Sequence, residues 1–179
     1  MSLRQPRWTR ALPADVVLAL ARVTPCGNIP FAPGTWGSLA GLAFFAVCLR
    51  PLAGVAGGVP LALAVGALII LAVPLCGEAE VRLGKTDPGE VVLDEFAVMP
   101  LCFLGWWRAL PPGWPEWAVL LAGFALFRLF DIWKPLGIKK LQRLPGGWGV
   151  VVDDVVAALA ACAALHFACR VWPTLGHAG

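Results

Sequence analysis

Long apolar runs separated by short polar stretches dominate the chain and predict an all-α protein. The cleanest run, 59–77, contains no charged residue, and none lies between it and Arg50. Runs at 39–55, 117–133 and 150–172 are of similar length, whereas 96–110 is shorter. Because roughly 20 apolar residues cross the hydrocarbon core of a bilayer, we predict an integral membrane bundle of about five helices. The third, 96–110, either crosses or is re-entrant.

The first 24 residues follow a different pattern. Arg4, Arg7 and Arg10 precede an apolar segment, 16–21, which ends at Arg22 and is shorter than the hydrophobic region of a signal peptide. We expect residues 1–24 to form a short amphipathic helix on the cytoplasmic surface. With 179 residues and no internal repeat, the whole chain, 1–179, is predicted to be a single membrane-embedded domain.

The stretch 24–38 interrupts the helical pattern, since three prolines and three glycines exclude a regular helix. The next helix is expected to begin at about 35–38, where Thr35 and Ser38 provide hydroxyl groups. These hydroxyls either cap the helix or, with the backbone N–H groups of 34–38, bind an anion. The sequence leaves both possibilities open.

Composition supports the membrane prediction and excludes several functions. Apolar residues make up 59% of the chain and the mean hydropathy is +0.78, against roughly 45–50% apolar usage in soluble domains. A net charge of +3 is too small to indicate a nucleic-acid partner. Two histidines, and six cysteines without a Cys-x-x-Cys pair, offer no zinc site. With the N-terminus inside, most Lys and Arg residues fall on the cytoplasmic side.

Carboxylates gather at the predicted cytoplasmic ends of neighbouring helices. A polar loop would be the simpler explanation, but loops between membrane helices usually carry Lys and Arg. A carboxylate within a helical span costs about 2.5–3.5 kcal/mol, so we expect a cation among these acids. Oxygen ligands alone favour Mg²⁺ over Zn²⁺. The acids are Glu78, Glu80, Asp87, Glu90, Asp94, Glu95, Asp131, Asp153 and Asp154.

Four segments resemble, in order, the motifs of the bacterial phosphatidylglycerophosphatase A family. They are 32–39 (Ala-Pro-Gly-Thr-Trp-Gly-Ser-Leu), 87–96 (Asp-Pro-Gly-Glu-Val-Val-Leu-Asp-Glu-Phe), 127–135 (Phe-Arg-Leu-Phe-Asp-Ile-Trp-Lys-Pro) and 146–154 (Gly-Gly-Trp-Gly-Val-Val-Val-Asp-Asp). The resemblance implies an all-helical, Mg²⁺-dependent phosphatase that converts phosphatidylglycerophosphate to phosphatidylglycerol. It further implies a multi-pass protein of the bacterial cytoplasmic membrane, with the active site facing the cytoplasm.

The chemistry of phosphate monoesters agrees with this resemblance. A metal neutralises the phosphoryl oxygens and lowers the pKa of an attacking water, and cationic side chains hold the other oxygens. We predict as catalytic residues Asp94, Glu95, Asp131, Asp153 and Asp154. The metal ligands are expected among Asp94, Glu95, Asp153, Asp154, Glu80, Asp87 and Glu90. The phosphate-binding residues are expected to be Arg128, Lys134, Lys85, Thr35 and Ser38.

Several alternatives stay open. The glycines of 146–149 form either a tight loop or a phosphate contact, and an aspartyl-phosphate intermediate is the alternative to direct attack by water. The rival function is a small cation-binding transporter, because intramembrane acids also line cation paths. Acids crowded at one face, without a repeat, favour the phosphatase. A phosphatidyl-transferring enzyme is disfavoured because its Asp-Gly-x2-Ala-Arg core is absent.

Overall fold

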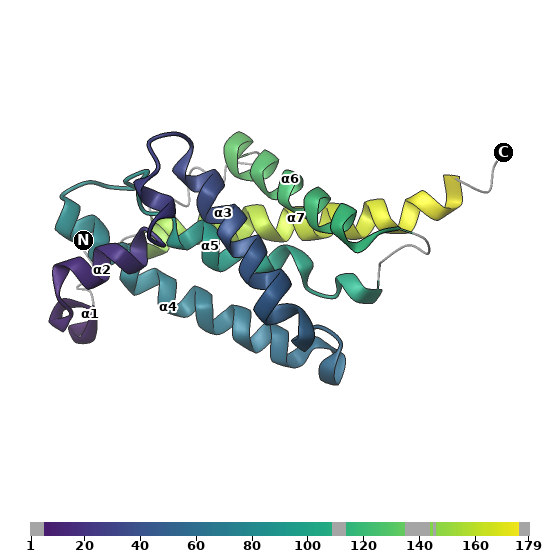
Figure 1. Cartoon of the computed structure of the whole chain (residues 1–179), viewed down its shortest axis with the longest axis horizontal. Coiled ribbons are helices and arrows are strands. Elements are labelled where there is room, and N and C mark those ends of the chain that lie inside the picture. The colour runs from purple at the N-terminus through teal and green to yellow at the C-terminus, as the bar shows by residue number, and fades with distance from the viewer. Residues whose placement is uncertain (1–5, 109–113, 135–143, 145, 176–179) are drawn as a thin grey trace.

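The computed structural model describes residues 6–108, 114–134, 144 and 146–175, and these residues form helices and turns without a strand. Figure 1 shows the seven α-helices of this part. They are α1 (Arg7–Ala11), α2 (Ala14–Ala21), α3 (Pro33–Phe44), α4 (Val59–Leu83), α5 (Leu93–Val98), α6 (Glu116–Trp133) and α7 (Gly147–Leu175). Shorter 3-10 or π-helical stretches are η1 (Cys26–Asn28), η2 (Phe45–Leu49), η3 (Arg50–Leu52), η4 (Val55–Gly58), η5 (Met99–Phe103) and η6 (Trp106–Arg108).

Five segments run between two ends of the molecule: α3 with η2, α4, α5 with η5 and η6, α6, and α7 (Figure 1). At one end, called the far end here, Arg50 pairs with Glu116, and a guanidinium nitrogen of Arg108 lies 3.5 Å from where a Cβ on Gly57 would stand. At the other end, called the site end, α7 begins and α1 and α2 lie against the C-terminal part of α4 (Figure 1). The all-α fold that we predicted is therefore confirmed, whereas five membrane crossings stay a prediction.

The third pass is not the single helix that we expected over 96–110. It consists of α5, six residues long, followed by η5 and η6. Pro100 lies in this run, and Gly105 has a positive φ of 73°, so no continuous helix forms. Among the described residues, three segments are long and apolar enough to span a membrane: Pro33–Leu52, Val55–Leu83 and Gly147–Val171.

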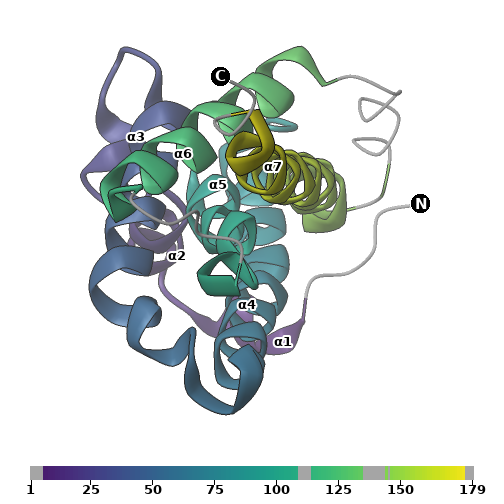
Figure 2. The ribbon, with the colours of Figure 1, turned by 90° about the vertical axis from the view of Figure 1, so that its right-hand side faces the viewer.

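The short helix α5 lies in the middle of the bundle, where it contacts α3, α4 and α7 (Figure 2). Val92, Ala97 and Val98, at and around it, are almost completely buried. Further along the same pass, Phe103 stacks on Phe45, with ring centroids 4.6 Å apart. Because the third pass is surrounded by other helices, its polar residues at 94–95 are held away from water.

The N-terminus differs from the single surface helix expected over 1–24. Pro13 separates α1 from α2, and Leu12 before it has the extended conformation that a following proline favours. Helix α2 contacts α4 and buries Val17 and Ala21 completely, so it belongs to the core. Arg82 fastens α1, since its guanidinium donates hydrogen bonds to the carbonyl oxygens of Thr9 and Leu12.

Three other helix boundaries differ from the expected ones. Helix α3 begins at Pro33, after Ala32 with φ +47°, and no side chain caps it; a proline suits the first turn because its missing N–H has no helical partner there. Helix α4 continues to Leu83, so the acids at 78 and 80 lie inside it. Helix α7 already begins at Gly147, so most of the expected glycine loop 146–149 is helical.

Candidate active site

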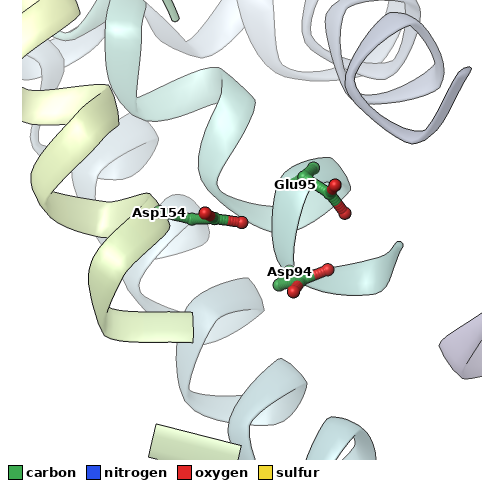
Figure 3. Close-up of side chains that lie close together, drawn as sticks. All are labelled: Asp94, Glu95 and Asp154. Carbon is green, nitrogen blue, oxygen red and sulfur yellow. The ribbon is translucent and has the colours of Figure 1, made fainter. Parts of the chain in front are cut away.

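Three carboxylates from two helices converge at the site end. Asp94 and Glu95 lie in the first turn of α5, and Asp154 lies two turns into α7. One ligand oxygen of each lies within 4.8 Å of the other two. Figure 3 shows Asp154 pointing from α7 towards α5. We call this group the carboxylate triad; residues 94 and 154 are only 4% and 3% exposed.

The triad has unused hydrogen-bonding capacity. In the described part of the chain, neither Asp94 Oδ1 nor Glu95 Oε2 has a hydrogen-bond partner, although both are buried. Two buried carboxylate oxygens without donors fit a hard divalent cation, which prefers oxygen ligands.

Two cationic side chains flank the triad, and both come from the C-terminal part of α6. Arg128 Nη1 lies 3.9 Å from Glu95 Oε1, and Lys134 Nζ lies 3.7 Å from Asp154 Oδ1. Asp131 connects the two cations, since its Oδ2 lies 2.7 Å from Arg128 and its Oδ1 3.4 Å from Lys134. The expected shared helix face of these three residues is therefore found.

Lys134 also determines the position of Asp153. It terminates α6 with φ +42°, and its ammonium donates a hydrogen bond to Asp153 Oδ2. Burial lowers the pKa of Lys134, but the charges of Asp154, Asp153 and Asp131 outweigh this effect and leave the pKa raised. Lys134 is therefore fully protonated. Asp153 lies next to the triad and is not part of it.

Ser38 and Gly34 contribute in ways that the sequence did not indicate. The Ser38 hydroxyl, fully buried, donates to the Gly34 carbonyl at 2.8 Å and accepts from Arg128 Nη1 at 3.2 Å. A Cβ added at Gly34 would stand 2.2 Å from Glu95 Oε1. Ser38 therefore orients Arg128, and a residue without a side chain at 34 makes room for Glu95. Thr35, on the same turn, is partly buried.

The other predicted site residues have different partners. Glu80 Oε1 accepts a hydrogen bond of 2.7 Å from the backbone N–H of Asp87. Both residues line a cavity of about 210 Å³ beside the N-terminus of α7. Glu90 pairs with Arg22 at 3.1 Å, and Lys85 is exposed. Of the described acids, residues 80, 87 and 90 are thus not in the triad, although we had included them among the ligands.

Glu78, which we had counted with the clustered acids, has a structural role. Its Oε1 accepts a hydrogen bond of 2.8 Å from Arg82 Nε, one turn along α4. Arg82 in turn holds the carbonyl oxygens of α1. The pair therefore attaches the N-terminal helices to α4, which explains the buried position of this acid.

Long apolar helices, with buried carboxylates and the side chains of Arg128 and Lys134 at one end, define a class of protein: a helical protein of the membrane type with an acid-rich centre. The comparison with known families narrows this class. The chain belongs to the phosphatidylglycerophosphatase A family, whose model matches residues 19–169. It is thus a phosphoric monoester hydrolase, as the sequence motifs predicted, and the transporter alternative is wrong.

Two curated relatives support this assignment over most of the chain. The phosphatidylglycerophosphatase A of Haemophilus influenzae is 38% identical over 148 residues, which cover 82% of this chain and 83% of the relative. The Escherichia coli phosphatidylglycerophosphatase A is 34% identical over 149 residues, covering 82% of this chain and 80% of the relative. No solved structure gives a significant match.

Proposed function

We propose that the chain hydrolyses the terminal phosphate of phosphatidylglycerophosphate, giving phosphatidylglycerol and phosphate, with Mg²⁺ held by Asp94, Glu95 and Asp154. The observation that carries this proposal is the buried carboxylate triad with unpartnered oxygens, in a chain of the phosphatidylglycerophosphatase A family. Mg²⁺ is preferred because the ligand atoms are all oxygens. When bound, such an ion supplies charge neutralisation at the phosphoryl oxygens and an activated water.

The remaining roles follow from the contacts. Arg128 and Lys134 each lie within 4 Å of a triad carboxylate, so a phosphate beside the triad would meet both. Arg128 can present a planar pair of N–H groups and Lys134 a point charge. Asp131 and Ser38 keep the guanidinium in place, and Asp153 does the same for the ammonium. We assign the last three as positioning residues.

The location that we propose is the cytoplasmic face of the bacterial cytoplasmic membrane. Arg22, Arg82 and Lys134 lie near the site end, whereas Arg50 and Arg108 lie at the far end. The positive-inside rule then puts the site end in the cytoplasm. Lys139, Lys140 and Arg143 of the basic loop lie outside the described residues. With the site end at the cytoplasmic surface of the membrane, the phosphate of a membrane lipid would reach the triad. We also propose that the chain is a single domain, that it crosses the membrane five times and that membrane lipids surround it.

The test is phosphate release from phosphatidylglycerophosphate across a Mg²⁺ titration. Asp94→Asn preserves volume and removes one ligand charge, so activity should nearly vanish at every Mg²⁺ concentration. Arg128→Ala and Lys134→Ala should lower kcat/KM roughly 10- to 150-fold with an unchanged Mg²⁺ requirement, because a charge-assisted hydrogen bond contributes about 1.5–3 kcal/mol. Asp15→Asn and Arg7→Ala, exposed positions outside the site, are the matched controls.

A second measurement separates metal binding from catalysis. A ligand that binds only the folded state raises its stability, so Mg²⁺ should raise the Tm of the wild-type protein in detergent. The same addition should leave the Tm of Asp94→Asn almost unchanged. Near-wild-type turnover by a folded Asp94→Asn variant, or an equal Mg²⁺ shift in both proteins, would rule out the triad as the metal site.

A further inference from the structure

An apolar groove of about 340 Å³ lies between α3 and α6 on the outside of the bundle. Leu42 at its floor is only 7% exposed. The hollow exists because the side chains at 43 and 46 are small alanines. The lining is apolar throughout and includes Leu39, Leu42, Ala43, Ala46, Trp117 and Leu121.

The groove lies on the same pair of helices as the proposed phosphate-binding residue Arg128 and its positioning residue Ser38. Ser38 and Arg128, which join α3 to α6 at 3.2 Å, lie at the site end of this helix pair. Leu39, the next residue of α3, already lines the groove, and Ala46 lies eight positions beyond Ser38. At 1.5 Å per residue, the groove extends roughly 12 Å from Ser38 towards the far end. The polar residues of the site and the apolar groove therefore follow each other along one pair of helices.

We propose that this groove holds an acyl chain of the lipid substrate while its terminal phosphate lies at Arg128 and Lys134. The inference rests on the proposed function, which supplies a substrate with a charged head and long apolar chains. The order of polarity along α3 and α6 matches that of such a lipid. Because membrane lipid is itself apolar, the groove contributes packing and alignment of the substrate, with little gain from the hydrophobic effect.

The experiment compares two substrates that share a head group. Ala43→Trp fills the groove at an exposed position. Since a small misplacement of a bound substrate can cost about a hundredfold in rate, kcat/KM for dipalmitoyl phosphatidylglycerophosphate should fall roughly ten- to a hundredfold, and that for the dibutyroyl substrate less than about twofold. The matched control is Ala67→Trp on the exposed side of α4, outside the groove; it should leave the ratio of the two kcat/KM values unchanged.

A photoreactive group halfway along the acyl chain provides a second readout on the wild-type protein. Labelled peptides should come from 39–46 and 117–121. Labelling that is equally strong on α4 would indicate bulk lipid and overturn the inference. So would an equal effect of Ala43→Trp on both substrates, or a change in oligomeric state with this variant, which would indicate a second copy of the chain. Wild-type protein inactive on both substrates would instead refute the proposed function, and the groove inference with it.

Discussion

At the scale of single residues, the carboxylates of the site outnumber the cationic side chains that could neutralise them. In the described part of the chain, the site combines five carboxylates with two cations: Asp94, Glu95, Asp131, Asp153 and Asp154 with Arg128 and Lys134. A buried charge without compensation costs several kcal/mol. A divalent cation removes most of this deficit. We therefore expect metal binding to stabilise the fold as well as to enable the reaction.

Gly34→Ala is the sharpest single-residue test of the site geometry. The new Cβ would stand 2.2 Å from Glu95 Oε1. Because that oxygen ends a flexible side chain, Glu95 can move away, and alanine improves helix propensity by about 1 kcal/mol. Stability should therefore be retained, whereas kcat/KM should fall on the order of a hundredfold, as a displaced catalytic group allows.

The control for this variant is Gly54→Ala, where an added Cβ meets nothing within 4 Å. Phosphate release and thermal unfolding are measured for both proteins. Full activity of Gly34→Ala would show that Glu95 has freedom to move without consequence. Glu95 would then have to be removed from the proposed metal ligands.

The chemistry of the site residues could be predicted from the sequence, but their contacts could not. Acids in apolar surroundings identified residues 94, 95 and 154, because such a position is costly without a cation. The role of Ser38 depends on a hydrogen bond to Arg128, 90 residues away, which no local pattern indicates. Likewise, nothing in the pair Asp153–Asp154 indicates that Lys134 bonds to the first and leaves the second to the triad.

At the scale of elements, the broken third pass is what makes the site possible. Hydropathy predicts that a segment is apolar, but not where its helix stops. Here Pro100 was the available sign, since a proline lacks the N–H group that an α-helix needs to continue; it lies instead in the 3-10 turn that follows α5. A short α5 lies among α3, α4 and α7, so its first turn presents Asp94 and Glu95 to the start of α7. A straight helix that only crosses a membrane does not need such a break.

Close contact between α4 and α7 should determine both stability and activity. A Cβ on Gly147 would stand less than 2 Å from the Val73 carbonyl oxygen and 2.7 Å from the Gly77 nitrogen. Both are backbone atoms, which cannot move away by a side-chain rotation. Gly147→Ala should therefore separate the helices and destabilise the protein by roughly 1–3 kcal/mol, as overpacking does. It should also displace Asp154, which α7 carries, and so lower phosphate release.

Gly66→Ala on α4 is the matched control, because its added Cβ meets nothing within 4 Å. This variant should be as stable as the wild type or more so, by up to about 1 kcal/mol of helix propensity. The readout is the thermal midpoint of each protein in the same detergent. A Gly147→Ala protein as stable as Gly66→Ala would mean that the two helices do not need this close approach.

At the scale of the whole molecule, the two ends differ in their chemistry. The site end holds the triad, its flanking cations and the attached N-terminal helices. The far end holds the ion pair between Arg50 and Glu116 and the turn of η4. Because the site residues all lie at one of these ends, a single orientation in a membrane would put every proposed functional side chain on the same side.

This orientation can be measured with cysteine labelling in intact cells. Lys85→Cys lies just past the site end of α4, and Val55→Cys lies in the far-end turn, where Val55 is 52% exposed. The six native cysteines are first replaced by serine or alanine, and phosphate release confirms that the background is active. A membrane-impermeant maleimide should then label Val55→Cys in intact spheroplasts and Lys85→Cys only after permeabilisation, because basic residues concentrate on the cytoplasmic side. Labelling of both positions from outside would show that α4, which separates them, does not cross the membrane, and would contradict the proposed arrangement. If only Lys85→Cys were labelled in intact spheroplasts, α4 would still cross the membrane but in the opposite orientation. The phosphatase site would then lie on the outer face.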